Sequence, residues 1–185
     1  MRIISGEARG RKLFAPAGED TRPTADRIRE SVFNILSARV WDAEVLDLFG
    51  GTGAMALEAL SRGAEHAVIV DSGREAIRAI ERNSQSVLKD AMPERVKILR
   101  ADYRAAIDAM RDVRFDLVFL DPPYRMADAY ADALTRLCAR GLLGENCICL
   151  LERAADAQIS LPDGFERYDT RTYGGTSVEF VREAR

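Results

Sequence analysis

The sequence predicts an α/β fold built on a mostly parallel sheet with helices on both faces. From residue 44 onward, short apolar runs typical of buried strands alternate with segments of helical spacing, which indicates parallel strands joined by helices. Four of these runs end at an acidic residue, and two strand-like segments near the carboxyl terminus flank a glycine pair, which favours an antiparallel hairpin. With 185 residues, 47% of them hydrophobic, the chain can bury one sizeable core.

The expected elements follow one another regularly. Strands are predicted at Val45–Leu48, Ala67–Val70, Val96–Arg100, Phe115–Leu120 and Cys147–Leu151. Helices are predicted near Ala54–Ser61, Arg74–Val87, Arg104–Met110 and Ala127–Ala139, with Gly63 and Gly141 as stops. The hairpin strands are Tyr168–Tyr173 and Thr176–Val181, joined at Gly174-Gly175 by a predicted type I′ turn. This seven-stranded, Rossmann-like order resembles the layout of class I methyltransferases.

The amino-terminal residues 1–39 differ in charge from the rest of the chain. They hold eight basic and five acidic residues, a net charge of +3, whereas the remainder carries −6. A small β-ribbon is predicted around Gly6 and Gly10, followed by a helix that Thr24 caps. The helix should bury one apolar face, formed by Ile28, Val32, Phe33, Ile35 and Leu36.

A basic edge on an acidic body is expected where a protein meets nucleic-acid phosphate, although a solvated charged hairpin and helix is an equal alternative. We therefore divide a single domain of residues 1–185 into an RNA-binding extension, 1–39, and a catalytic core, 40–185. The candidate RNA contacts are Arg9, Arg11, Lys12, Arg22, Thr24, Arg27 and Arg29.

The sequence Asp121-Pro122-Pro123-Tyr124 directly follows an apolar strand, which places Asp121 at the carboxyl end of the sheet. Two prolines stiffen the loop, so the Asp121 carboxylate and the Pro122 carbonyl form a pair of acceptors. Such a pair suits the two N–H donors of an exocyclic amine on a nucleobase, and Tyr124 offers a ring for stacking. The alternative is a solvent-facing aspartate that opens a proline turn. We predict Asp121, Pro122 and Tyr124 to be catalytic.

The loop after the first strand, Asp47-Leu48-Phe49-Gly50-Gly51-Thr52-Gly53-Ala54, predicts a cofactor site because glycines let the backbone approach a ligand. It also satisfies the dinucleotide fingerprint, so a nicotinamide cofactor is a rival. Asp47 favours S-adenosylmethionine, since a carboxylate attracts an ammonium and a sulfonium but repels a pyrophosphate. The candidate cofactor residues are Asp47, Phe49, Gly50, Gly51, Gly53, Asp71, Ser72, Asp102 and Tyr103.

Two acidic residues at later strand ends complete this site. We expect Asp71 to accept both ribose hydroxyls and Asp102 to accept from the adenine amino group, although each could instead cap the following helix. No metal site is expected, because His66 is the only histidine and Cys147 and Cys149 lie in an apolar strand. The chain has no apolar run of 18 residues and no signal-peptide core, which favours a cytoplasmic protein without a membrane segment.

These residues resemble the bacterial 16S ribosomal RNA guanine N2-methyltransferases nearly from end to end. The shared segments are Met1–Gly6, Gly10–Leu13, Arg22–Leu36, Leu46–Gly53, Asp121–Tyr124 and Tyr173–Thr176. The most specific is the arginine-rich block from Arg22, since the glycine loop and the proline loop recur in many amino methyltransferases. Gly50 stands where the family usually has Ala, and Gly175 where it usually has Asp, so this chain has no side chain at either position.

The resemblance implies methylation of guanine N2 in 16S RNA, at the family's target guanine 966, by a monomer that acts on the RNA or on a small-subunit assembly intermediate. Asp121 and the Pro122 carbonyl would then orient the amine toward the methyl group, so positioning is most of the catalysis. Three alternatives remain. They are an N6-adenine methylase of DNA or RNA, a nicotinamide-dependent oxidoreductase, and a non-catalytic RNA-binding module.

Overall fold

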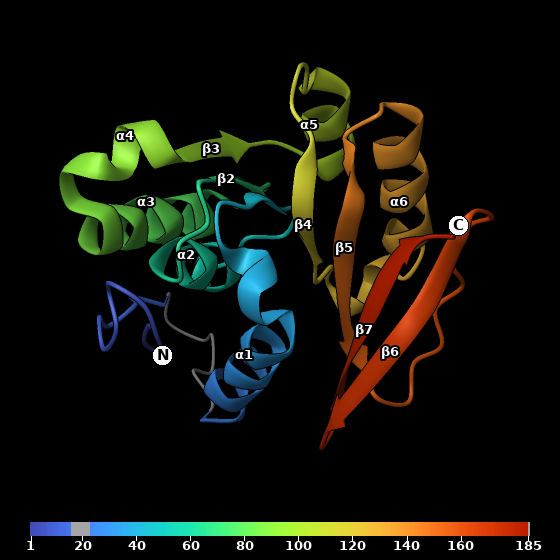
Figure 1. The fold of residues 1–185 in the computed structure, drawn as a ribbon, viewed down its shortest axis with the longest axis horizontal. Helices are drawn as coiled ribbons and strands as arrows, with labels where there is room; N and C mark the ends of the chain where they lie inside the picture. The colour runs from blue at the N-terminus through green and yellow to red at the C-terminus, as the bar shows by residue number, and fades with distance from the viewer. Residues whose placement is uncertain (16–22, 185) are drawn as a thin grey trace.

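The structure is a computed structural model that describes residues 1–15 and 23–184. Its centre is a seven-stranded sheet with the strand order β3-β2-β1-β4-β5-β7-β6 (Figure 1). In chain order the strands are β1 Glu44–Asp47, β2 His66–Asp71, β3 Val96–Arg100, β4 Phe115–Leu120, β5 Leu143–Ala154, β6 Phe165–Tyr173 and β7 Thr176–Glu183.

The direction of strand addition reverses between β1 and β4. β1 pairs in parallel with both β2 and β4, and the sheet grows outward to β3 on one side and to β5 on the other. β7 lies antiparallel between β5 and β6. In open sheets of this kind, ligands bind beyond the carboxyl ends of the strands at the reversal. The predicted Rossmann-like architecture is confirmed, and it locates a binding crevice at the ends of β1 and β4.

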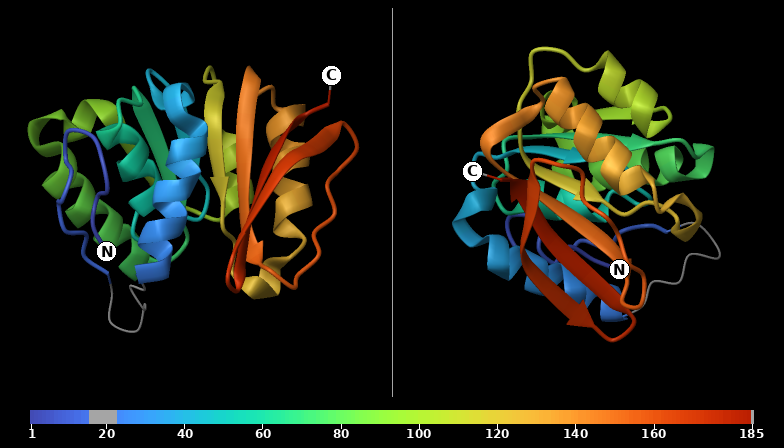
Figure 2. Two further views of the ribbon diagram at one scale, coloured as in Figure 1. Left: turned by 60° about the horizontal axis from the view of Figure 1, so that its bottom comes forward. Right: turned by 90° about the vertical axis from the view of Figure 1, so that its right-hand side faces the viewer.

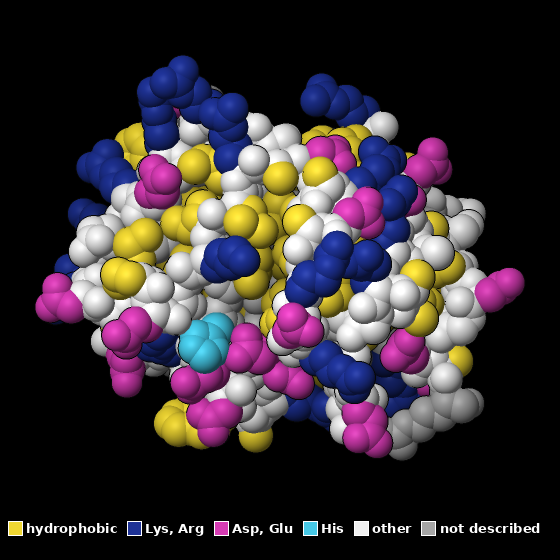
Figure 3. All heavy atoms as spheres, turned by 90° about the horizontal axis from the view of Figure 1, so that it is seen from above, with side chains coloured by type: hydrophobic (Ala, Val, Ile, Leu, Met, Phe, Trp, Pro, Cys, Tyr) yellow, Lys and Arg dark blue, Asp and Glu magenta, His cyan; other side chains and the backbone are white. Residues whose placement is uncertain are grey.

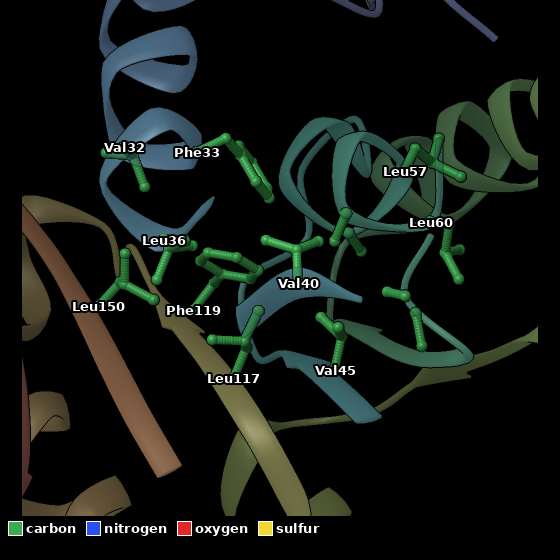
Figure 4. Packing of buried hydrophobic residues seen from close by; sticks show 14 of the residues in the cluster. Val32, Phe33, Leu36, Val40, Val45, Leu57, Leu60, Leu117, Phe119 and Leu150 are labelled. Atoms are coloured by element: carbon green, nitrogen blue, oxygen red, sulfur yellow. The ribbon is translucent and has the colours of Figure 1, made fainter. Parts of the chain in front are cut away.

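Helices cover both faces of this sheet. On one face lie α1 Pro23–Leu36, α2 Ala54–Ser61 and α3 Arg74–Leu88; on the other lie α5 Tyr103–Ala109 and α6 Ala129–Ala139 (Figures 1 and 2). Because side chains alternate along a strand, β4 contributes to both cores. Phe119 packs toward α1, where its ring lies 5.9 Å from that of Phe33 (Figure 4). Val118 packs toward α5 and α6.

The amino-terminal ribbon is present, although only one β-bridge forms in it, between Arg2 and Lys12. The ribbon is fastened to the helices beside it (Figure 2). The backbone N–H groups of Ile4 and Ser5 donate to the buried Glu58 carboxylate of α2, at 2.7 and 3.0 Å. At the other end, Phe14 exchanges two hydrogen bonds with Asn83 of α3. Buried polar groups therefore fix the extension to the core.

Helix α1 begins at Pro23, so the prediction that Thr24 caps it was wrong. Proline suits a first helical position because its φ is already helical and its missing N–H is not needed there. The predicted apolar face is also corrected at one residue, because Ile35 is 37% exposed whereas Ile28, Val32, Phe33 and Leu36 are buried.

Other element boundaries differ in ways that the sheet explains. β5 extends beyond the predicted Cys147–Leu151 because it pairs with β7 as far as Ala154. Of the two hairpin glycines only Gly174 has a positive φ, +59°, which fits a type II′ turn and not the predicted type I′. The short helix α4 Met92–Arg95 and the 3₁₀ helices η1 Ser37–Val40, η2 Lys89–Ala91 and η3 Tyr124–Met126 were not predicted.

The face at the amino ends of the strands lies opposite the crevice. Figure 3 shows it, with the only histidine, His66, among interspersed acidic and basic side chains. Cys147 and Cys149 are buried in β5, as predicted. Within residues 1–15 and 23–184, no helix is long and apolar enough to cross a bilayer. No group of three or more metal-binding side chains occurs in that part of the chain either.

Candidate active site

A cleft of about 580 Å³ opens at the carboxyl ends of β1, β2 and β4, where the strand order reverses. A volume of this size suits a small-molecule cofactor or a nucleotide. Ten of the predicted catalytic and cofactor residues line it, together with Arg29, which was predicted to contact RNA, and with others from the ribbon, α1 and β5. The ten are Asp47, Phe49, Gly50, Gly51, Asp71, Ser72, Asp102, Tyr103, Asp121 and Pro122.

Asp47 ends β1 at the floor of the cleft and is only 4% exposed. Burial raises the pKa of its carboxyl to about 7, and repulsion from the nearby Asp121 and Asp71 carboxylates adds to this shift. A bound cation would relieve both effects, because it favours the ionised carboxylate. The geometry therefore fits a positively charged ligand group and disfavours a pyrophosphate.

The glycine loop is held open by Asp71, at the end of β2. One carboxylate oxygen of Asp71 accepts the Gly51 N–H at 2.9 Å, and the other accepts the Gly73 N–H at 2.7 Å. Gly51 has φ +53°, and a side chain there would meet no atom within 4 Å, so its backbone borders open cleft space. Gly53 does not line the cleft and instead precedes helix α2, with φ +78°. The loop can thus present bare backbone to a ligand.

The third strand end contributes a cap as well as a potential ligand contact. Asp102 caps α5 by accepting the Arg104 N–H at 2.9 Å through one oxygen, which is the alternative role considered for it. Its other oxygen accepts no hydrogen bond within the described part of the chain, and Asp102 lines the cleft. Tyr103 is buried, with its ring 5.3 Å from that of Phe49 and its hydroxyl donating to Asp132 at 2.8 Å. Tyr103 therefore supports Phe49, which borders the cleft.

The proline loop carries Asp121 into the cleft from the end of β4. The Asp121 side chain is exposed in the cleft, and partial loss of water around its carboxyl raises the pKa to about 6. Pro122 is buried, and among the described residues no hydrogen-bond donor is directed at its carbonyl. The Pro123 carbonyl accepts the Met126 N–H at 2.8 Å, which fixes the turn. The backbone of Tyr124 begins η3, and its side chain lies outside the described part of the structure.

A further acid in the cleft, Glu152 on β5, was not predicted. It lines the same cleft as Asp121, and the register pairs Leu120 with Leu151, so the two acids follow neighbouring positions of adjacent strands. Burial raises the pKa of its carboxyl to about 8, and the charge of Asp121 adds to the shift. The rule that revealed the other acids at strand ends applies to Glu152 too, because Glu152 directly follows the predicted strand Cys147–Leu151.

Comparisons with known proteins agree with this geometry. The family model described as "Conserved hypothetical protein 95" matches residues 1–182. The protein named ribosomal RNA small subunit methyltransferase D in Escherichia coli is 37% identical over 187 residues, which cover 100% of this chain and 91% of that one. Its namesake in Haemophilus influenzae is 32% identical over 182 residues, covering 98% and 93%. The chain belongs to this methyltransferase family.

Solved structures show the same fold throughout. A candidate methyltransferase from Escherichia coli matches with a TM-score of 0.85 and 27% identity, over 99% of this chain and 97% of that one. A candidate methylase from Haemophilus influenzae matches with a TM-score of 0.81 and 27% identity, over 100% and 99%. The seven-stranded sheet with its antiparallel hairpin is therefore the class I methyltransferase fold.

The basic residues predicted to contact RNA in this methyltransferase fall into three groups. Arg9, Arg11, Lys12 and Arg27 are exposed on the ribbon and on α1. Arg22 and the side chain of Thr24 lie outside the described residues. Arg29 is only 3% exposed: its guanidinium donates to Asp26 at 2.9 Å and to the Arg2 carbonyl, and it lies 3.6 Å from Glu58. Arg29 therefore holds α1 to the ribbon, and it also lines the cleft.

Proposed function

We propose that this protein transfers a methyl group from S-adenosylmethionine to the N2 amino group of a guanine in 16S ribosomal RNA. The observation that carries the proposal is the acceptor pair formed by Asp121 and the Pro122 carbonyl, which shares one cleft with Asp47 and the glycine loop. Family membership supports ribosomal RNA as the substrate, since relatives at 32% and 37% identity are named for methylation of small-subunit RNA.

The residues present fit S-adenosylmethionine. Asp47 would face its ammonium and sulfonium charges, and the Gly51 backbone would let the methionine portion pass close to the loop. Asp71 and the free oxygen of Asp102 would accept from the ribose hydroxyls and from the adenine amino group. When bound, the cofactor supplies a methyl group that is ready for nucleophilic attack.

The chemical step requires a better nucleophile than free guanine offers. The N2 lone pair is delocalised into the ring, so the amine must be turned toward the methyl carbon with its two hydrogens directed at acceptors. Asp121 and the Pro122 carbonyl supply those acceptors. Once the amine accepts the methyl group that the bound cofactor would supply, the amine would become acidic, and Asp121 would take its proton. A carboxyl whose pKa lies near 6 is ionised at neutral pH and can take it.

The RNA would approach over the ribbon and α1. Met1 and Ile28 line the cleft, so the exposed Arg11 and Arg27 belong to elements that border its mouth. Extruding a guanine from structured RNA costs about a few kcal/mol of stacking. Phosphate contacts from the exposed basic residues would offset that cost.

A labelled-methyl assay tests the proposal. Unmodified 16S RNA should be offered naked, as an assembly intermediate, and as a finished subunit, and the nucleosides should then be identified by mass spectrometry. We expect one methyl group per particle, recovered as N2-methylguanosine at guanine 966. Recovery of N6-methyladenosine would retain the fold and Asp121 but reject guanine as the target, because the two amines lie on different edges of a purine.

A further inference from the structure

The Glu152 carboxyl has no partner among the described residues, although it is half-buried. Among the described residues no hydrogen bond or ion pair reaches its side-chain oxygens, whereas its neighbour Arg153 pairs with Glu179 at 2.7 Å. An unpaired carboxylate away from bulk water is costly, and such groups are concentrated at functional sites. We therefore expect a bound ligand to donate a hydrogen bond to the Glu152 carboxylate in the cleft.

The backbone of β5 holds Glu152 rigidly beside Asp121. Glu152 pairs with Val178 of β7 in the sheet, and the backbone carbonyl of Glu152 accepts a hydrogen bond from the Tyr130 hydroxyl of α6 at 2.5 Å. Leu150, two residues earlier on the strand, packs in the core beneath α1, so alternation directs Glu152 to that same side of the sheet. Asp121 comes two residues after Phe119, which belongs to the same core, so alternation directs Asp121 to that side as well. The two acids thus lie on one side of the cleft at adjacent strand ends.

We propose that Glu152 selects guanine by accepting a hydrogen bond from the ring N1–H while Asp121 and the Pro122 carbonyl hold the adjacent N2 amine. This inference rests on the proposed function and adds a residue that specifies the base. The acceptors of the proline loop suit any exocyclic amine, so they do not distinguish guanine from adenine. The distinction must come from the atom next to the amine.

That neighbouring atom differs between the purines. Guanine presents the N1–H donor beside N2, whereas adenine presents the bare N1 acceptor beside N6. An ionised Glu152 carboxylate bonds to the first and repels the second, whereas a protonated carboxyl would donate to the bare N1. The discrimination therefore belongs to the ionised form, which predominates above about pH 8 in the empty cleft. The raised pKa of Glu152 belongs to the empty cleft, and an N–H donor would favour its charged form again. Discrimination of this type is strong because the wrong base leaves a buried polar group unpaired.

The base 2-aminopurine tests this directly, since it keeps the amine at position 2 but has a bare N1. Small-subunit particles should carry either guanine or 2-aminopurine at the methylated position. Above pH 8, where the Glu152 carboxyl is ionised, we expect kcat/KM to favour guanine by about tenfold or more for the unaltered protein. In E152Q the side-chain amide can donate to N1, so the preference should fall by about tenfold or more while cofactor affinity, measured by calorimetry, stays unchanged.

The matched control is E145Q, which removes the same charge from an exposed site at the other end of β5 and should keep the parental preference. An unaltered protein that methylates both bases equally well would overturn the role of Glu152, whatever the variants do. So would an E152Q protein that turns over with the parental preference. Failure of the proposed function looks different. The unaltered protein would then produce N6-methyladenosine, or it would produce no methylated guanosine at all.

Discussion

At the scale of single residues, the cleft gathers carboxyl groups whose tasks differ according to their surroundings. Asp47 is buried and suits a cation, Asp71 shapes the loop, and Asp121 faces the cleft where the reacting amine is proposed to bind. The shifted pKa values of Asp47, Asp121 and Glu152 share one leading cause, which is loss of water around each group. Perturbed groups of this kind in one cleft are typical of catalytic sites.

Replacement of Asp121 by Asn should separate binding from chemistry. Asn keeps the shape of the side chain but cannot take the amine proton, so we expect the methylation rate to fall by about 100-fold or more while the calorimetric affinity for S-adenosylmethionine is retained. Asp128→Asn is the control, because Asp128 is exposed and makes no capping hydrogen bond. A rate close to that of the unaltered protein would exclude Asp121 from the chemical step.

The site shows what residue-level prediction can and cannot reach. Asp47, Asp71, Asp102 and Asp121 could be found from sequence because each follows an apolar strand, and all four line the cleft. The burial of Arg29 was not predicted, because charge and helical spacing do not reveal a buried carboxylate from another element. Its partner Glu58 lies on α2, 29 positions away in the chain, and only the packed structure brings the two within 3.6 Å.

At the scale of elements, the interiors of strands and helices were predicted better than their ends. β3 and β4 agree with the predicted ranges at both termini, since runs rich in apolar residues mark both the buried strand β4 and the half-exposed edge strand β3. The extent of β5 could not be predicted locally, because its last residues are strand only through pairing with β7. The Gly174 turn likewise depends on how the hairpin twists, which two consecutive glycines leave open.

Glu58 should be the main stabilising link between the ribbon and the core. Its buried carboxylate accepts the Ile4 and Ser5 N–H groups, and its ion pair with Arg62 measures 2.7 Å. We expect Glu58→Gln to lower the free energy of unfolding by about 3–5 kcal/mol, because it leaves buried cationic groups without their counter-charge. Denaturant unfolding measures the change. The exposed Glu65→Gln should have almost no effect, and equal losses in both variants would contradict this link.

The ribbon and α1 should contribute phosphate contacts to RNA binding. Arg11→Ala and Arg27→Ala each remove an exposed cation, so we expect weaker binding and a salt dependence whose slope falls by about one unit per lost contact. Fluorescence anisotropy over a range of salt concentrations gives the slope. Arg114→Ala is the control, since Arg114 is exposed at the amino end of β4, opposite the cleft. Slopes that match the control would leave the basic extension as a solvated surface.

At the scale of the whole molecule, the fold brings the ends of five strands to one place while its stability comes from elsewhere. Two hydrophobic cores, one on each face of the sheet, hold the strands in register. The cleft lies at the edge between them and contains acids that would be more stable in water. Placing these carboxyl groups in the cleft thus lowers the stability of the folded state, as is usual in active sites.

This cost predicts how stability depends on pH. The folded pKa values of Asp47, Asp121 and Glu152 are raised to about 7, 6 and 8, so the folded protein retains protons that the unfolded chain releases above about pH 4. Stability from these groups is complete below that pH and is lost as the pH rises through the folded values. We therefore expect the free energy of unfolding of the ligand-free protein to decrease from pH 5 to pH 8, as measured with denaturant.

S-adenosylmethionine should reverse this trend, because a cation beside Asp47 favours the ionised carboxylate and lowers its pKa. The stabilisation by saturating cofactor should then grow with pH over the same interval, and binding at pH 6 should release protons that calorimetry detects in buffers of different ionisation enthalpy. Asp47→Asn, which cannot ionise, should flatten the pH dependence of the ligand-free protein and release fewer protons on binding. A free energy of unfolding that rises between pH 5 and pH 8 without ligand would show that the cleft acids ionise freely, and the electrostatic account of the cofactor site would have to be abandoned.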